Sequence, residues 1–167
     1  ADRSLAHIDT ALRRRFEFRE LMPAPNLLKP VILGGLEINL HDVLKVMNRR
    51  IEILFDREHQ IGHAYFLKGE GETVSGAELP QIFEHKIIPL LTEYFFEDWS
   101  KVRAVLADDQ SEDHPEHQFV RVVEHDGNLF SSQASARTKQ VYRLNHQAFT
   151  KPEAYLKIYQ SLESGRY

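Results

Sequence analysis

The stretch NLHDVLKVMNRRIEILF, residues 39–55, carries the clearest secondary-structure signal in the chain. Its apolar residues recur every three or four positions from Leu40 to Phe55, while Lys45 and Asn48 belong to an opposite, polar face. This spacing predicts an amphipathic helix whose apolar face packs into a helical domain. Asn39 stands directly before the first apolar residue, where a helix N-cap is expected.

Capping patterns predict two further helices. Ser75 and Glu78 form a capping-box pattern ahead of an apolar-periodic run, in which Pro89 should kink or split the helix. Thr150 and Glu153 form a second capping-box pattern ahead of the last helix of the chain. The sequence therefore predicts a mainly α fold of the α+β class.

The region between these helices predicts a small antiparallel β element. An acidic loop, DDQSEDHPEH (residues 108–117), precedes FVRVVEHDGNLF (residues 119–130), which predicts a strand, an Asp-Gly turn and a second strand. VYRLN, residues 141–145, is a third strand candidate. Upstream of the long helix, MPAPNLLKP (residues 22–30) predicts a hinge because three of its nine residues are prolines, and Gly34-Gly35 prolongs it.

Composition excludes several classes of protein. The chain has 167 residues, of which 42% are hydrophobic and 28% charged, as in soluble globular domains. The net charge of −4 argues against nucleic-acid binding by bulk charge, and the absence of cysteine excludes disulfides and thiolate metal sites. No apolar run is long enough to span a membrane. We expect a cytoplasmic protein without a membrane partner.

Neither metal nor nucleotide chemistry is predicted for the chain alone. His114 and His117 lie three residues apart among acidic residues, but Pro115 separates them and the segment predicts a loop, so we expect no metal site. The sequence has no GxxxxGK[ST] loop, and therefore nothing to cradle a triphosphate. We expect the chain alone to hydrolyse no nucleoside triphosphate.

The N-terminal stretch ADRSLAHIDTALRRRF, residues 1–16, concentrates positive charge at the end of a short predicted helix. Arg13, Arg14 and Arg15 are consecutive, and burying three guanidinium groups requires an anion. They are either a solvated helix end or a site that recognises an anion such as a phosphate. The chain starts abruptly at this stretch, which we interpret as a piece of a longer protein.

Long strings of the sequence resemble one protein family. ADRSL…IDTALRRRF, the proline-rich break and LKVMNRRIEILFDREHQIGHAYF are similar to the McrB family of AAA+ NTPases, the motor subunits of modification-dependent restriction systems. The resemblance covers roughly residues 1–107. It implies a C-terminal fragment: residues 1–30 are the end of the AAA+ α/β core with the hinge, residues 31–107 are a helical-bundle lid, and residues 108–167 hold the acidic loop, the β element and the last helix.

The resemblance also implies roles for residues near the N-terminus. Arg14 and Arg15 match the positions of arginine-finger candidates, which act in trans on the nucleotide of the next subunit. Asp2 and Arg3 match a stretch near the nucleotide and the subunit interface. Arg13 fits the pattern without a distinct role.

In the lid, His63 and Tyr65 fall in a GH[AS]YF signature, which implies that they face the nucleotide or the adjacent subunit. From the residues alone, packing at a helix end remains an equal alternative. The parent protein would hydrolyse Mg-GTP or Mg-ATP in a homo-oligomeric ring and act on DNA through an McrC-like nuclease, whereas the fragment needs no cofactor. The alternative is a stand-alone helical interaction module that binds a protein or a nucleic acid through its β element, which is surrounded by the basic residues Arg121, Arg137, Lys139 and Arg143.

Overall fold

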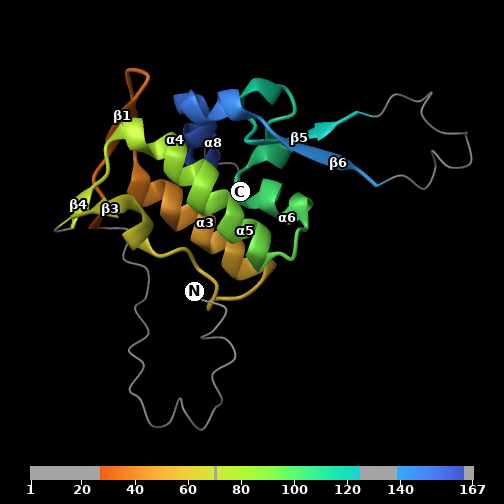
Figure 1. Ribbon diagram of the computed structural model, residues 1–167, viewed down its shortest axis with the longest axis horizontal. Coiled ribbons are helices and arrows are strands. Elements are labelled where there is room, and N and C mark those ends of the chain that lie inside the picture. Colours follow the sequence, from red (N-terminus) through yellow and green to blue (C-terminus); the bar gives the residue numbers. More distant parts are fainter. Residues whose placement is uncertain (1–26, 70, 125–138, 164–167) are drawn as a thin grey trace, which may run out of the picture.

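The computed structural model describes residues 27–69, 71–124 and 139–163, which form an α+β domain dominated by helices, as the sequence predicts. The described helices are α3 (Leu40–Leu54), α4 (Leu79–Ile82), α5 (Ile88–Tyr94), α6 (Trp99–Val105) and α8 (Pro152–Glu163). The described strands pair in antiparallel fashion: β1 (Val31–Leu33) with β2 (Leu36–Ile38), β3 (Leu67–Lys68) with β4 (Glu72–Thr73), and β5 (Val120–Val123) with β6 (Val141–Leu144). In Figure 1, α3 crosses the middle of the domain and the β5–β6 ribbon projects beyond the helices. Within the described ranges, no helix has the length and apolar character needed to cross a membrane.

Helix α3 forms where the sequence predicts it. The Asn39 side chain accepts a hydrogen bond from the Asp42 amide at 3.3 Å and caps the first turn. The apolar stripe is buried from Leu40 to Ile51, and α3 contacts both α6 and α8. The amide of Asn39 also donates to the hydroxyl of Tyr159 on α8, at 3.1 Å. Helix α8 therefore holds the beginning of α3.

The hairpin of β1 and β2 replaces part of the expected hinge. Val31 pairs with Ile38, and Gly34 and Gly35 form the turn with φ values of 57° and 79°. A two-residue hairpin turn of this kind needs positive φ at both central positions, which glycine adopts without a Cβ clash. The prediction that these glycines only prolong a hinge is wrong, because a Gly-Gly pair between two apolar runs is itself a hairpin signal.

A close backbone approach joins this hairpin to the start of α4. The capping box is confirmed: the Glu78 carboxylate accepts hydrogen bonds from the Ser75 amide at 2.7 Å and from its hydroxyl at 3.0 Å. The Ser75 amide, helped by Lys68, holds the pKa of Glu78 below its ordinary value. A Cβ on Gly76, the next residue, would collide with the carbonyl oxygen of Ile32. Only glycine lets the two backbones meet here.

A π-helical turn, Phe83–Ile87, connects α4 to α5 and accommodates Pro89. Proline has no amide hydrogen to donate, so it interrupts the regular ladder of an α-helix. The wider π turn lies directly before it and lets the helix continue into α5, where Pro89 sits in the first turn. The sequence predicted that Pro89 kinks or splits the helix, and the structure shows a π-helical turn between α4 and α5.

One hydrophobic core joins the predicted lid to the C-terminal region. Phe83 packs against Phe119 and Tyr155 with ring centroids 5.6 and 4.8 Å apart, and Phe119 also contacts Phe149. Strand β5 pairs with β6, which confirms the third strand candidate, while the Asp-Gly turn lies outside the described residues. The core therefore continues across residue 107, where the sequence suggested a boundary.

A buried polar network fixes the crossing from α6 to β5. Asp108 is fully buried, and its carboxylate accepts hydrogen bonds from the amides of Phe119 and Val120 at 3.0 and 2.8 Å. The same carboxylate pairs with Lys157 of α8 at 2.9 Å. Burial raises the pKa of Asp108, although Lys157 and the two amides oppose the shift, and burial lowers the pKa of Lys157. Arg103 adds hydrogen bonds to the carbonyls of Val120 and Asp108.

Candidate functional site

The predicted N-terminal site residues lie outside the part of the chain that the structure describes. Arg14 and Arg15, the finger candidates, and Asp2, Arg3 and Arg13, the nucleotide or interface candidates, therefore keep their predicted roles as predictions. The described part of the candidate site is the segment that carries His63 and Tyr65.

His63 and Tyr65 share one short 3₁₀ helix, His63–Phe66, which follows Gly62. Both side chains are partly buried, whereas Phe66 is completely buried and packs against Phe83 with a ring-centroid distance of 5.9 Å. Phe66 therefore anchors the turn in the core, and the two polar-aromatic side chains remain near the surface. The structure thus brings the two predicted lid residues together on one anchored turn.

Asn48 fixes this segment to α3. Its side-chain amide donates to the carbonyl of Ile61 at 2.9 Å, and its oxygen accepts from the amide of the same residue at 2.6 Å. Asn48 is only 5% exposed, so the prediction that it belongs to the polar face opposite the apolar stripe is wrong. The sequence does not reveal that a loop elsewhere in the chain will form hydrogen bonds with a polar side chain on an amphipathic helix. The clamp sets the position at which the chain enters the His63 turn.

The loop between α3 and this turn is shaped by a second local contact. The Asp56 carboxylate accepts a hydrogen bond from the His59 amide at 2.9 Å and lies 2.7 Å from the ring Nδ1 of His59. Partial burial acts to raise the pKa of Asp56, but the hydrogen bonds from His59 outweigh it and hold this pKa below its ordinary value. The His59 ring meets Phe55 and Tyr94 edge-on, with centroids 4.4 and 5.2 Å apart. The loop is therefore tied to both α3 and α5.

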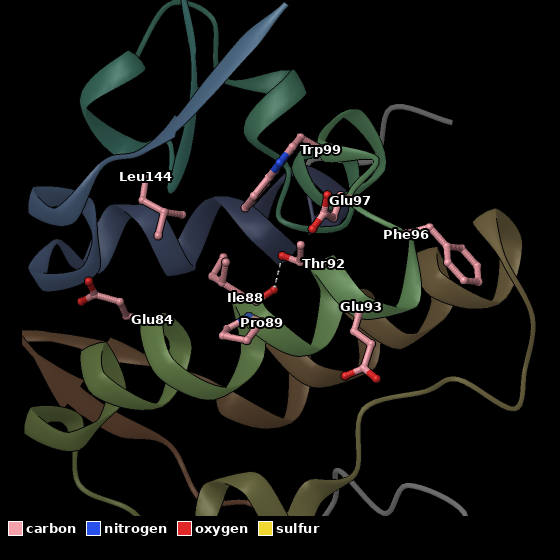
Figure 2. Close-up of a pocket in the computed structure, with 9 residues that line it drawn as sticks. All are labelled: Glu84, Ile88, Pro89, Thr92, Glu93, Phe96, Glu97, Trp99 and Leu144. Atoms are coloured by element: carbon pink, nitrogen blue, oxygen red, sulfur yellow. Dashed lines mark hydrogen bonds between the residues drawn. The ribbon is translucent and has the colours of Figure 1, made fainter. Parts of the chain in front are cut away.

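A separate groove of about 660 Å³ lies along α5 (Figure 2). Ile88 and Pro89 form its apolar floor, and Trp99 and Leu144 line the opposite side. The acidic side chains Glu84, Glu93 and Glu97 also line it. Carboxylates repel phosphate groups, so this groove does not suit a nucleoside triphosphate. Neither His63 nor Tyr65 lines it.

The end of this groove holds an unusual turn. Phe96 and Glu97 have φ values of 50° and 63°, a left-handed conformation that costs a residue with a Cβ roughly 1–2 kcal/mol. Phe96 is nevertheless 80% exposed, and Figure 2 shows its ring turned away from the groove floor. At the other end, Glu84 pairs with Nδ1 of His146 at 2.6 Å.

Comparison with known proteins bears on the helical part of the domain. Residues 39–103 match the family model described as McrB, alpha-helical lid domain. This range begins at the N-cap of α3 and ends within α6, and it includes the His63 turn.

One curated relative extends the match. The chain is 35% identical over 111 residues to the type IV methyl-directed restriction enzyme EcoKMcrB subunit of Escherichia coli K12, and the alignment covers 59% of this chain and 24% of that protein. The match thus spans about a quarter of the relative's length, so its full activity does not transfer with the match. The family model and the relative name the same protein family, and the structure describes the fold and caps of residues 39–103. Residues 39–103 are therefore similar to the alpha-helical lid domain of the McrB family.

Proposed function

We propose that this chain is the lid-containing part of an McrB-like AAA+ NTPase, which hydrolyses Mg-GTP or Mg-ATP in a homo-oligomeric ring. The observation that supports this proposal is the match of residues 39–103 to the lid domain family, on a folded helical domain with a proline-rich segment directly upstream. Lid domains close over a ligand by movement at such hinges, which excludes water from the reacting groups.

In this proposal the site is shared between subunits. His63 and Tyr65 face the nucleotide or the neighbouring subunit. The buried Phe66 and the Asn48 clamp hold their turn in a fixed position on the domain. Arg14 and Arg15 are the proposed arginine fingers, which act in trans on the γ-phosphate held by the next subunit. There a guanidinium group neutralises charge that develops in the transition state.

The proposed biological role is restriction of modified DNA. The E. coli relative is named as a subunit of a methyl-directed restriction enzyme, and the ring formed by the present protein would likewise act on DNA with an McrC-like nuclease. The nucleotide-driven ring supplies the mechanical work and the nuclease supplies the cleavage. The location that fits this role is the cytoplasm.

The isolated chain of 167 residues should bind neither GTP nor ATP with micromolar affinity, because its sequence contains no phosphate-binding loop. Isothermal titration calorimetry with each nucleotide in the presence of Mg²⁺ checks this. The control is the intact protein, which should bind one of the two nucleotides under the same conditions. Micromolar binding by the isolated chain would contradict the assignment of the triphosphate site to residues upstream.

A second candidate function rests on the β5–β6 ribbon. Arg121 and Arg143 are direct cross-strand partners, and both are exposed. Like charges directly opposite each other destabilise a strand pair, so an anion between them would relieve the repulsion. The ribbon projects beyond the helices in Figure 1 and is accessible to a large partner. This placement favours an interaction module that contacts nucleic-acid phosphates through the ribbon.

This second function predicts DNA binding that weakens steeply with salt. Fluorescence anisotropy with a labelled duplex, measured at several salt concentrations, gives the slope of log affinity against log salt. Replacing Arg121 and Arg143 by glutamine should reduce that slope by about 1 for each arginine that binds a phosphate. The control is Lys86→Gln, which removes an exposed charge from the π turn and should leave the slope unchanged. No detectable binding by the wild-type chain at low salt would exclude this function.

A further inference from the structure

We propose that His114, Glu116 and His117 form a binding site for a divalent transition-metal ion such as Zn²⁺. Of the residues that the structure describes, these three side chains bring their ligand atoms within 4.8 Å of one another. The site lies in the acidic loop between α6 and β5, and the proposal is independent of the NTPase function.

The distances between ligand atoms fit a single ion. Glu116 Oε1 lies 3.2 Å from Nδ1 of His114 and 3.6 Å from Nε2 of His117. Bonds of about 2.0–2.1 Å from Zn²⁺ to nitrogen or oxygen place neighbouring ligands of a tetrahedron roughly 3.3 Å apart. The two measured distances bracket this value, so a small side-chain adjustment places the ion among the three atoms.

A 3₁₀ helix explains why the two histidines meet. Pro115 begins the short helix Pro115–His117, where a missing amide hydrogen has no cost. A 3₁₀ helix has three residues per turn, so side chains three apart lie directly above one another. The rings of His114 and His117 are accordingly stacked, with centroids 5.3 Å apart and planes 20° from parallel. Our expectation that Pro115 keeps the histidines apart treated the segment as an irregular loop, and the structure contradicts it.

The backbone beneath the cluster is held from two sides. The side-chain amide of Asn145 donates to the carbonyls of Gln118 and Glu116 at 3.1 and 3.4 Å, and the His117 amide donates to the His114 carbonyl at 2.9 Å. Gln118 is 3% exposed, and its side chain donates to the carbonyl of Ser111 at 2.8 Å. The ligands therefore stand on an ordered turn, which lowers the cost of bringing them together.

The donor set selects the class of metal. Two imidazoles and one carboxylate suit Zn²⁺, Ni²⁺ or Co²⁺, whereas Mg²⁺ and Ca²⁺ prefer oxygen ligands alone. Three protein ligands leave a fourth position of a tetrahedral ion for water.

Calorimetric titration of the untagged chain with ZnCl₂ tests the proposal. We expect saturable binding, with a melting temperature that rises by about 5–10 °C when free Zn²⁺ is one hundred times the dissociation constant. His114→Ala and His117→Ala should each weaken binding by about tenfold or more, since even the outer partners of metal ligands contribute that much. Glu116→Gln should weaken it as well, and MgCl₂ should give no comparable heat.

The matched control is His146→Ala, which removes an exposed histidine that pairs with a different carboxylate, Glu84. This variant should bind Zn²⁺ as tightly as the wild-type chain. The ligand side chains lie on the surface or at its edge, so the variants should keep the circular dichroism spectrum of the wild type. Binding that does not saturate, or an equal loss of affinity in His146→Ala and His114→Ala, would overturn the site.

Discussion

Replacing Arg14 and Arg15 together by alanine in the intact NTPase is expected to lower the turnover number by about 10³–10⁵-fold. An arginine finger stabilises charge that appears only as the phosphoryl group is transferred. Its loss therefore reduces turnover much more than nucleotide binding. Steady-state hydrolysis assays of the double variant and of each single variant, combined with nucleotide titrations, measure the two effects separately. The single variants identify which arginine contributes more.

The matched control for the finger is Arg49→Ala. This arginine lies exposed on α3, so its removal changes the net charge by the same amount as each single variant and should leave turnover near the wild-type value. Because a finger acts on the neighbouring subunit, rings of mixed wild-type and variant subunits should hydrolyse at intermediate rates. Wild-type turnover in both single variants and in the double variant would show that these residues are not fingers.

Asp108→Ala is expected to destabilise the domain by about 3–5 kcal/mol, a large part of the roughly 5–15 kcal/mol that stabilises a typical domain. The substitution leaves the buried ammonium group of Lys157 without its carboxylate and removes the acceptor of the Phe119 and Val120 amides. Urea denaturation followed by circular dichroism gives the free energy of unfolding. If the alanine variant does not fold, the decrease in unfolding free energy can be measured with Asp108→Asn, which keeps an acceptor for the amides.

Two comparisons isolate the cause of that loss. Asp109→Ala removes the exposed neighbouring carboxylate and should change the unfolding free energy by less than about 0.5 kcal/mol. Combining Asp108→Asn with Lys157→Met removes both buried charges, and it should recover part of the stability lost in the single variant. A loss below about 1 kcal/mol for Asp108→Ala would mean that water reaches the pair.

The sequence was most informative where a structure depends on neighbouring residues. The period of α3, the Asn39 cap and the Ser75–Glu78 capping box are local patterns, and all three are confirmed. Strand β6 was equally visible as an alternating run. The predicted α+β class follows from these elements together.

What the sequence did not reveal depends on residues far apart in the chain. The burial of Asn48 is decided by Ile61, and the need for glycine at position 76 is decided by the carbonyl of Ile32. The pairing of His114 with His117 depends on a 3₁₀ turn. Asn145, which lies 30 residues after Pro115 in the sequence, holds this turn by a hydrogen bond to the Pro115 carbonyl. Periodicity cannot identify such partners, because it reports only which side of an element is apolar. Arginine-finger and nucleotide roles at the N-terminus rest on resemblance alone and stay predictions.

The hydrogen bond from Asn39 to Tyr159 spans 120 positions of the chain, and it has a consequence for biosynthesis. A ribosome that adds about 5–20 residues per second needs roughly 6–25 seconds to proceed from the start of α3 to the end of α8. During that interval the apolar face of α3 lacks α8, one of the two helices that pack on it. The hydrophobic core of the nascent protein is therefore incomplete during this time. Chaperone binding or aggregation competes with folding until α8 leaves the exit tunnel.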